Sequence, residues 1–370
     1  MHTQRGQCRQ RDAAAVSHCK GDEGCIEIER KTTSLQKDNM NAMALVRDVP
    51  YLDDVIFYFG CFTLLKAALY AFSVIARVLY TGPNVKARYP KNAYAVITGG
   101  NRGIGRGYAE EFARQGLNLL LIARTLKSND PSKKGETLMD AKEELTNKYG
   151  VDVRIHQADI SMNDRGTWDE ITEQLHDINV AVLVNNAGIS YESAMYFTEV
   201  DTNRIDVLIG LNVMALTRMT RIVLDQWEEN NEKGDIVNIT SYAGVNPAGD
   251  PLYAVYSGTK AYVQFFSRSL HYELRSKGIN VECHVPHFVT SRMSRIRRSS
   301  IMVPSEKAWA KAAVQNIGRP FAGPLITPYW FHAFCEFVID SLPDMFIVNF
   351  LLSHHHAVRR KWLKKKQKQN

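Results

Sequence analysis

Residues 235–262 have the sequence DIVNITSYAGVNPAGDPLYAVYSGTKAY. This stretch predicts an apolar strand over 236–240, then a loop rich in Gly and Pro, then a helix. In that helix Tyr256 and Lys260 lie four positions apart, so their side chains share one face. An ammonium beside a phenol favours the phenolate and lowers the pKa of the tyrosine from about 10 toward the working range. We therefore predict that Tyr256 is a general acid or base, assisted by Ser241 at the end of the strand.

Charge and cysteine content narrow the class of protein. The chain has 370 residues, with 46 Lys and Arg against 39 Asp and Glu. Residues 359–370 carry seven basic and no acidic side chains, so the rest of the chain is balanced. The basic excess is therefore a property of the tail and gives no reason to expect nucleic-acid binding. The six Cys form no C-x-x-C pair and have no metal-type spacing, which predicts reduced thiols, no metal site and a cytosol-facing protein.

The region before residue 92 predicts a polar extension and an anchor. Residues 1–50 are polar with mixed charge, and we predict that they are disordered. Residues 55–76 form an apolar run long enough to span a bilayer, within a predicted membrane-anchoring helix at 51–82. Lys66 falls in the middle of the run and makes insertion less favourable. An in-plane membrane helix and a buried soluble helix therefore remain as alternatives.

From Ala93 onward, apolar strands alternate with helices. Strands are predicted at 93–98, 118–123, 153–157, 180–184, 236–240 and 280–285. Helices are predicted at 104–115, before 149, at 202–229 and at 254–276. Strands that are apolar throughout and alternate with helices indicate a parallel sheet covered on both faces. We therefore predict an α/β, Rossmann-like doubly wound domain over residues 92–320.

A glycine-rich loop lies between the first strand and the first helix. Residues 98–105 read T-G-G-N-R-G-I-G, and glycines at this place permit a close approach of a pyrophosphate to the helix N-terminus. Strand two ends in Arg124, where a carboxylate would bind the ribose 2′-hydroxyl of NAD. Together with Arg102, this guanidinium favours a 2′-phosphate and hence NADP(H). The alternative is that Arg124 is a surface cation at a strand end.

These motifs together resemble the short-chain dehydrogenase/reductase family over residues 92–300. The resemblance rests on the glycine loop, Asp159, N-N-A-G at 185–188, Asn212 in L-N-V-M-A, Ser241 and Y-S-G-T-K at 256–260. It implies that Tyr256 protonates a carbonyl oxygen which Ser241 orients, and that Lys260 binds the nicotinamide ribose. It also implies that Asn212 holds a water molecule linking Lys260 to solvent. Ser241 precedes Tyr256 by 15 residues, where the family usually has about 13.

The residues expected to contact NADP(H) come from six parts of the chain. They are Gly99, Asn101, Arg102, Gly103, Ile104, Gly105, Arg124, Asp159, Asn185, Ala187, Gly188, Tyr256, Lys260 and Val289.

A narrower resemblance covers residues 50–370. P-H-F-V-T-S-R-M at 286–293, V-P-S at 303–305, F-H-A-F at 331–334 and S-L-P at 341–343 are similar to membrane-bound very-long-chain 3-oxoacyl-CoA reductases and to 17-beta-hydroxysteroid dehydrogenases of types 3 and 12. This implies an endoplasmic-reticulum protein facing the cytosol that reduces a 3-oxoacyl-CoA in fatty-acid elongation, with elongation proteins and a second copy as candidate partners. Reduction of a 17-ketosteroid or other lipophilic ketone is the first alternative. A non-catalytic cofactor-binding membrane scaffold is the second.

Four arginines between 292 and 298 stand on the expected substrate side. Arg292, Arg295 and Arg298 would share a face if the segment were helical. The phosphates of CoA would explain such a cluster, since Arg forks bind phosphate oxygens well. Anionic lipid headgroups or a solvated face would explain it too. We predict Ser241, Arg292 and Arg295 as substrate contacts.

The C-terminal segment 321–370 is predicted to be an amphipathic arm. It is rich in aromatic and aliphatic residues, and Glu336, Asp340 and Asp344 recur every four positions. A polar stripe on an apolar surface favours lying on a membrane over spanning it. Docking against another subunit is the alternative. The chain ends K-Q-K-Q-N, which resembles a K-x-K-x-x retrieval signal.

Overall fold

The computed structural model describes residues 51–79, 85–131, 134–162, 164–319 and 323–368. The predicted polar extension at 1–50 lies outside these residues. The chain divides into two units, one ending at Ala71 and one beginning at Phe72.

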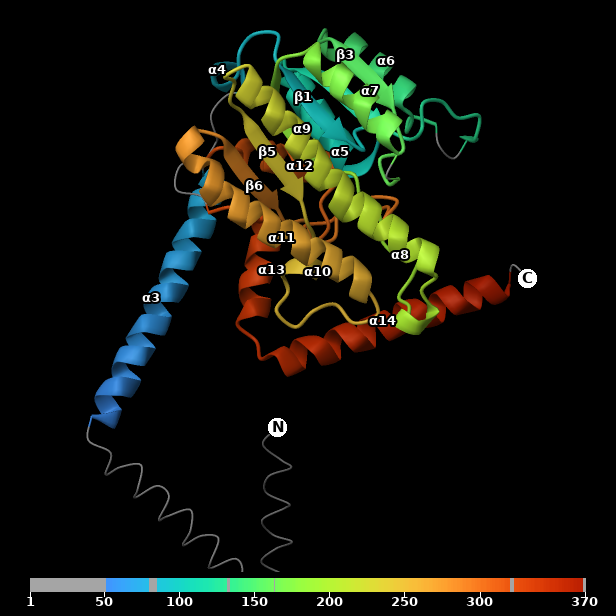
Figure 1. The fold of residues 1–370 in the computed structure, drawn as a ribbon. Helices are drawn as coiled ribbons and strands as arrows, with labels where there is room; N and C mark the ends of the chain where they lie inside the picture. Colours follow the sequence, from blue (N-terminus) through green and yellow to red (C-terminus); the bar gives the residue numbers. More distant parts are fainter. Residues whose placement is uncertain (1–50, 80–84, 132–133, 163, 320–322, 369–370) are drawn as a thin grey trace, which may run out of the picture. The chain divides into compact units, whose positions relative to one another are not determined.

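A seven-stranded parallel sheet forms the centre of the second unit (Figure 1). Its strand order is β3-β2-β1-β4-β5-β6-β7, which confirms the predicted doubly wound fold. The strands are β1 Tyr94–Thr98, β2 Asn118–Ala123, β3 Val153–Gln157, β4 Val180–Asn185, β5 Asp235–Ile239, β6 Asn280–His284 and β7 Leu325–Ile326. The first six match the predicted strands within one or two residues. The two-residue edge strand β7 was not predicted.

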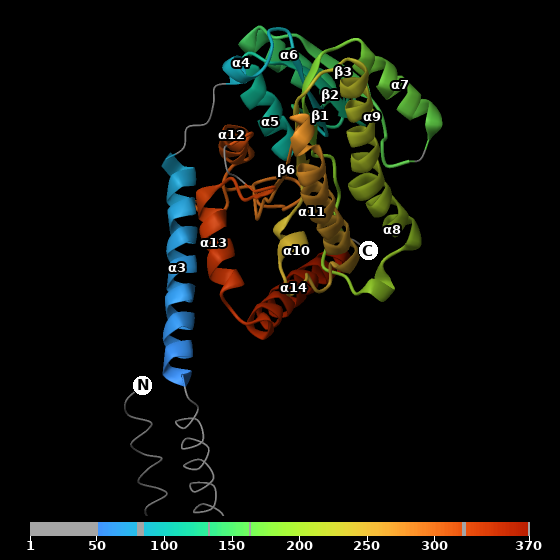
Figure 2. The same ribbon diagram turned by 60° about the vertical axis from the view of Figure 1, so that its left-hand side comes forward.

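The helices of the second unit lie on both faces of the sheet, as Figure 2 shows. The core of one face comes from α5 Gly103–Arg114, α6 Leu138–Tyr149 and α12 Glu306–Asn316. The core of the other comes from α7 Arg165–His176, α9 Leu216–Glu229 and α11 Ala254–Leu274. The remaining helices are α4 Val85–Arg88, α8 Thr202–Ile209, α10 Tyr242–Val245, α13 Trp330–Asp340 and α14 Asp344–Gln367. Because helices cover both faces, apolar side chains can fill every position along the inner strands.

Two features of the helices differ from what the sequence predicted. The helix expected to run unbroken over 202–229 contains a π-helical turn, Gly210–Ala215, between α8 and α9. A Cβ at Gly210 would stand 2.2 Å from the carbonyl oxygen of Ser161, so the chain at this turn passes directly against the loop after β3. The helix α7, which buries Trp168, Ile171 and Leu175, was not predicted at all.

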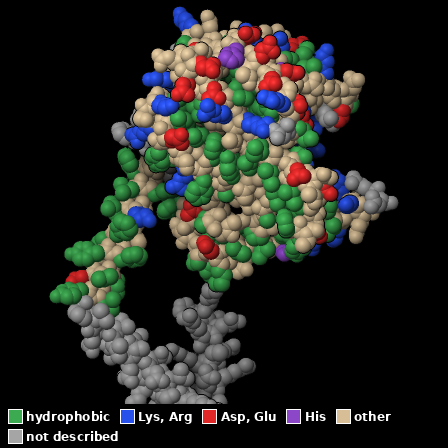
Figure 3. Space-filling model, in the orientation of Figure 1, with side chains coloured by type: hydrophobic (Ala, Val, Ile, Leu, Met, Phe, Trp, Pro, Cys, Tyr) green, Lys and Arg blue, Asp and Glu red, His purple; other side chains and the backbone are tan. Residues whose placement is uncertain are grey.

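Helix α3, Leu52–Leu79, covers the apolar run expected to be a membrane anchor. Its segment Leu52–Ser73 has a mean hydropathy of 1.8 and is unburied, and Figure 3 shows hydrophobic side chains along it. The segment Thr202–Glu229 is also long and apolar enough to cross a bilayer, but 44% of it is buried because it packs on the sheet. Length and composition therefore leave α3 as the candidate anchor among the described residues.

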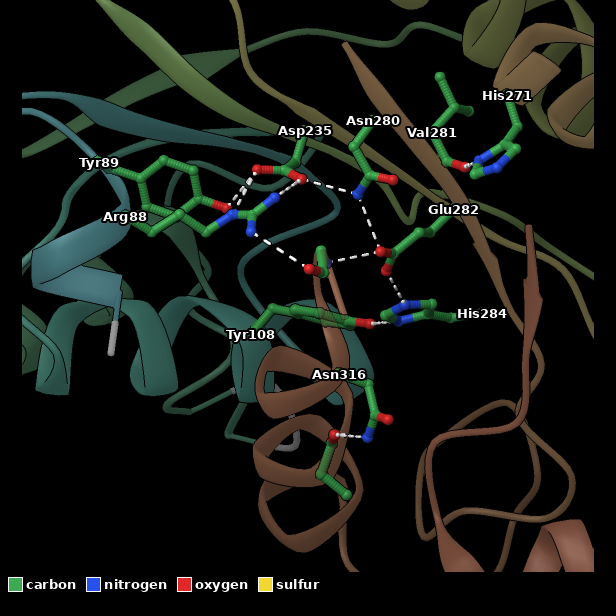
Figure 4. A network of polar contacts seen from close by, with 12 residues as sticks. Arg88, Tyr89, Tyr108, Asp235, His271, Asn280, Val281, Glu282, His284 and Asn316 are labelled. Carbon is green, nitrogen blue, oxygen red and sulfur yellow. Dashed lines mark hydrogen bonds and ion pairs between the residues drawn. The ribbon is translucent and has the colours of Figure 1, made fainter. Parts of the chain in front are cut away.

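A buried polar network joins the start of the second unit to β5 and β6 (Figure 4). The Arg88 guanidinium donates to both carboxylate oxygens of Asp235, at 3.0 and 2.6 Å, and the Tyr89 hydroxyl donates to the same carboxylate at 2.7 Å. Asn280 donates to Asp235 and to Glu282, at 2.7 and 2.8 Å. The Asp235 side chain is only 3% exposed, so its charge depends on these donors.

The same network continues along β6 to helix α5. Glu282 accepts from the Gly318 N–H at 2.6 Å and pairs with His284 Nε2 at 3.0 Å. His284 Nδ1 contacts the Tyr108 hydroxyl at 2.7 Å. These groups are buried, so they are hydrogen-bonded to one another rather than to water.

We expect Arg88→Ala to destabilise the protein by about 3 kcal/mol, because it leaves a buried carboxylate without its cation. Urea unfolding of detergent-solubilised protein measures this loss. Arg221→Ala is the matched control: its partner is Asp225, the two side chains are 74% and 40% exposed, and we expect a change within about 0.5 kcal/mol. Equal effects of the two substitutions would contradict a structural role for the buried pair.

Candidate active site

Four predicted catalytic residues come together at the carboxyl ends of β4 and β5. Ser241 follows β5 and caps α10, while Tyr256 and Lys260 lie on α11. Ser241 and Tyr256 share a side-chain hydrogen bond. The two residues that lengthen the loop between them therefore do not separate the hydroxyl from the phenol. Asn212 reaches the same region from the π-helical turn, a helix irregularity often found at functional sites.

Asn212 and Lys260 are both fixed by hydrogen bonds to the backbone. The Asn212 side chain accepts from the Ile189 N–H at 2.9 Å and donates to the Ile189 carbonyl at 3.0 Å. Lys260 Nζ donates to the Ile239 carbonyl at the end of β5 at 2.9 Å. A Cβ at Gly188 would stand 3.2 Å from Asn212 Oδ1 and 3.3 Å from Lys260 Nζ. The missing side chain of Gly188 thus lets the loop after β4 lie directly against both groups.

The pKa of Tyr256 moves in the opposite direction from the one expected. Burial raises it above 10, the hydrogen bond from Ser241 opposes this rise, and the charge of Asp250 adds to it. The expected lowering by Lys260 is wrong, because burial is the largest influence on the pKa of the phenol and Lys260, which donates to the Ile239 carbonyl, is not among the groups that shift it. Tyr256 is therefore a phenol at neutral pH, the form that can donate a proton.

Lys260 is itself strongly affected by its surroundings. Burial lowers its pKa from 10.5 to about 8. Its side chain is 5% exposed, so the ammonium has lost most of its hydration. A lysine whose pKa lies near the working pH can gain or lose a proton during turnover.

The glycine loop forms a cradle at the N-terminus of α5. Gly99 and Gly103 have φ values of +67° and +58°, which side chains rarely adopt. A Cβ at Gly105 would stand 2.4 Å from the Gly99 carbonyl oxygen, so only glycine fits there. Thr98 Oγ1 accepts from the N–H groups of Asn186 and Ala187, both at 3.0 Å, and ties this loop to the one after β4.

This cradle fits a dinucleotide pyrophosphate. The Arg102 side chain does not cap α5, so the first N–H groups of the helix remain free to bind an anion. Arg102 and Arg124 are each about half exposed, and their partners are carboxylates: Glu136 at 3.9 Å and Asp159 at 3.6 Å. Both guanidinium groups can therefore turn to an added phosphate. Ser161 hydrogen bonds and the Arg124 charge lower the pKa of Asp159, although burial opposes them.

Other predicted cofactor residues have different surroundings. The Asn185 side chain donates to Thr220 and Asn238, both at 2.9 Å, so it points into the protein and holds β4 against its neighbours. Asn101 donates to the Glu136 carbonyl at 2.6 Å. Ile104 packs partly against the core, and Val289 is 3% exposed within it. For these residues, only the backbone or a limited part of the side chain is available to a ligand.

The arginine segment is not a helix. Residues 291–296 form a turn closed by a bridge between Ser291 and Ile296, and Arg295 has a φ of +57°. The three-residue spacing therefore does not place these arginines on one helical face. Arg292 Nε instead forms an ion pair with Glu136 at 2.7 Å. This contact joins the loop after β6 to the loop beside the cofactor cradle.

Sequence reasoning did not single out Asp250 or His355 as site residues. His355 on α14 lies 3.6 Å from Asp250, in the loop between Ser241 and Tyr256. The only signal was the extra loop length, because the partner lies 105 positions further along the chain. Such a contact follows from the tertiary structure alone.

Comparisons with known proteins give the family. The short chain dehydrogenase family profile matches residues 93–301. The chain belongs to the short-chain dehydrogenase family. It is therefore an oxidoreductase of this family, which confirms the recognition made from the motifs.

Relatives with assigned names make the comparison more specific. The chain is 37% identical over 279 residues to the very-long-chain 3-oxoacyl-CoA reductase of Anas platyrhynchos, covering 75% of this chain and 84% of that protein. It is 32% identical over 318 residues to the Homo sapiens protein of the same name, covering 85% and 96%. These names confirm the narrower resemblance to the reductases.

Among solved structures, a short-chain dehydrogenase from Sphingobium yanoikuyae in complex with NADPH is 27% identical, with a TM-score of 0.53. The match covers 68% of this chain and 96% of that one.

Lys260→Met should abolish turnover yet stabilise the ligand-free protein at pH 7. Because the folded-state pKa of about 8 lies below the unfolded value of 10.5, the folded state bears the full cost of the buried charge below pH 8. This shift corresponds to about 3 kcal/mol, less about 1 kcal/mol for the lost hydrogen bond. Wild-type stability should rise between pH 8 and 10.5, so the advantage of the variant should disappear there. Urea unfolding across pH measures this, and a pH-independent difference would contradict it.

Proposed function

We propose that this protein reduces a 3-oxoacyl-CoA to a 3-hydroxyacyl-CoA with NADPH, as a step of long-chain fatty-acid elongation. The observation that carries the reductase chemistry is the contact between the protonated Tyr256 phenol and Ser241, above the buried Lys260. The substrate class is supported by the names of the relatives, which match 75–85% of this chain. The same contact argues against a non-catalytic scaffold, because the acid and its partner are in place.

The proposed reaction divides the work between cofactor and protein. NADPH, when bound, supplies the hydride that adds to the keto carbon. Ser241 and Tyr256 hydrogen-bond the keto oxygen, and Tyr256 gives it a proton as charge develops there. Lys260 stabilises the resulting phenolate, and Asn212 connects Lys260 to a returning proton. Both side chains are already held in place by the backbone, so little reorganisation is needed.

We propose the glycine cradle as the pyrophosphate site and Arg102 with Arg124 as the 2′-phosphate site. The free N–H groups at the start of α5 support the first assignment. The exposed guanidinium groups support the second, since Arg forks match phosphate oxygens. Asp159 then lies beside the adenine end of the cofactor, and Gly188 lies toward the nicotinamide.

We propose that α3 anchors the protein in the endoplasmic-reticulum membrane with the reductase domain in the cytosol. The exposed apolar surface of α3 supports this. Helices α13 and α14 add exposed apolar side chains, among them Phe334, Met345, Phe346 and Phe350. This surface supports a C-terminal arm that lies on the membrane. Elongation proteins and a second copy of the chain are the proposed partners, and exposed Phe265 and Tyr272 on α11 offer a surface for the latter.

Detergent-purified protein should oxidise NADPH with a 3-oxoacyl-CoA of about 16 carbons and not with a 17-ketosteroid. Tyr256→Phe should lower kcat by about 10²–10⁴-fold, the range typical of a lost general acid. Tyr262→Phe is the matched control on the same helix: its hydroxyl contacts Thr217 on the exposed surface, and activity should be retained.

Each other outcome has a distinct meaning. Turnover of the steroid alone would mean that the substrate is a ketosteroid and not an acyl-CoA, while the proposed reduction by NADPH and Tyr256 would still hold. Full activity of Tyr256→Phe would overturn the mechanism. NADPH binding without turnover of either substrate would support the scaffold alternative.

We further propose that Arg292 and Arg295 bind phosphates of CoA. Arg292→Ala combined with Arg295→Ala should raise KM for the acyl-CoA about tenfold or more, but not KM for a ketone that lacks CoA. Glu136→Ala tests whether the positive charge of the two arginines or the fixed position of Arg292 matters. It breaks the Arg292 ion pair and leaves both cations in place. Equal changes of KM for both substrates would show that the arginines hold the conformation of the loop after β6 and do not bind CoA.

A further inference from the structure

Helix α14 packs along one face against the loops at the carboxyl end of the sheet. Buried and half-buried residues recur on it every three or four positions, so they share one face of the helix. They are Ile347, Leu351, His355, Arg359 and Trp362. Figures 1 and 2 both show α14 passing below α10 and the amino end of α11. The helix is therefore docked on the Tyr256 side of the sheet.

Arg359 makes the polar contacts between α14 and the loop after β4. Its guanidinium forms an ion pair with both carboxylate oxygens of Glu199, at 2.7 and 2.5 Å, and donates to the Ala194 carbonyl at 3.4 Å. It also lies over the Tyr196 ring, 5.1 Å from the ring centroid. A pair that uses both carboxylate oxygens fixes the orientation of the two groups as well as their distance. Helix α14 thus holds this loop in one position.

The loop after β4 in turn holds the start of α11. The Met195 N–H, next to the residue that accepts from Arg359, donates to the Leu252 carbonyl at 3.0 Å. The Val255 N–H donates to the Tyr191 hydroxyl at 3.0 Å. Tyr256 follows Val255 directly, so a continuous series of contacts runs from α14 through the loop after β4 to the candidate acid.

The segment just before Tyr256 has a conformation that depends on these contacts. Leu252 has a φ of +68°, which is uncommon for a residue other than glycine and persists only where the surroundings enforce it. Besides the hydrogen bond from Met195 to Leu252, His355 Nδ1 on α14 contacts the neighbouring Pro251 carbonyl at 2.8 Å. The segment is therefore held from both the loop after β4 and α14.

We propose that Arg359 is a positioning residue for the reductase reaction: through the loop after β4, it holds the start of α11 so that the Tyr256 phenol stays beside Ser241. The proposal rests on the proposed role of Tyr256 as the acid. Proton transfer needs the acid within hydrogen-bond reach of the reacting oxygen, so a small displacement of Tyr256 lowers the rate of the chemical step. Helix α14 thereby contributes to the reaction through the two loops.

Arg359→Met tests the proposal, because Met keeps an apolar stem over Tyr196 and lacks the donors to Glu199 and Ala194. We expect kcat to fall about three- to thirtyfold. The fall should be the same for acetoacetyl-CoA and for 3-oxopalmitoyl-CoA, because the acid is common to both reactions. KM and the affinity for NADPH should change little, since the interaction lost acts in the transition state.

Tyr191→Phe tests the other end of the series, because it removes the hydroxyl that accepts from the Val255 N–H. It should lower kcat in the same way, with KM and NADPH affinity again little changed. The variant that combines it with Arg359→Met should lose little more than the more affected single variant. Substitutions that break one series of contacts are not additive.

Arg360→Met is the matched control, because it makes the same substitution at the adjacent, exposed position, and kcat should be retained. Unchanged kcat in Arg359→Met, or additive losses in the combined variant, would overturn the proposal. So would a loss confined to the long acyl chain, which would mean that Arg359 serves the acyl chain or the membrane, or an equal fall in NADPH affinity, which would mean a general loosening of the site. Full activity of Tyr256→Phe would instead overturn the acid assignment, so the two failures are distinguishable.

Discussion

The hydrogen bond from the Lys260 ammonium to the Ile239 carbonyl sets the geometry of the candidate active site. It joins the carboxyl end of β5 to the middle of α11 in a place from which water is excluded. Gly244 of α10 lies so close to Lys260 that a Cβ there would come within 2.4 Å of its backbone. Ser241 and Tyr256, on either side of this contact, are thereby brought within hydrogen-bonding reach. A buried ammonium is unfavourable in itself, so this fixed arrangement of polar groups lowers the free energy of unfolding of the protein.

The carboxyl ends of β1, β4, β5 and β6 supply the other parts of the site, as expected for a doubly wound sheet. At these ends the chain repeatedly uses glycine to bring segments together. Gly105 admits the turn of the cradle, Gly188 lies against Asn212 and Lys260, and Gly210 lets the π-helical turn meet the loop after β3. At Gly105 and Gly210 a side chain would clash, and at Gly188 it would be tightly crowded, so the site depends on close backbone packing.

Under the proposed function, the C-terminal helices would link membrane attachment to the reaction. Their exposed face carries Phe346 and Phe350, while the opposite side of α14 buries His355 against the loop before Tyr256. The same element thus offers an apolar surface for lipid and a polar contact for the site. A long acyl substrate would reach the catalytic tyrosine beside this surface. The arrangement gives a physical reason for keeping the arm within the reductase chain.

The sequence by itself determined six of the seven strands of the described sheet, their parallel arrangement and the positions of the candidate catalytic and cradle motifs. Alternating apolar strands and helices with a 3.6-residue period admit few other arrangements, and Tyr256 and Lys260 share a face by helix geometry alone. Local patterns also located Gly99, Gly103 and Gly105, because a turn at a helix start has a recognisable composition.

Only the tertiary structure decided the charge state of Tyr256, the π-helical turn at Asn212 and the contact of His355 with Asp250. The spacing of Tyr256 and Lys260 suggested a lowered pKa, but burial and Asp250 raise it. Burial depends on everything packed around a group, and no local pattern reports it. The turn at 291–296 and the contacts of α14 likewise depend on residues far away in the chain. Short-range periodicity therefore predicted the strands and helices, whereas packing between distant segments set the pKa values of the buried side chains.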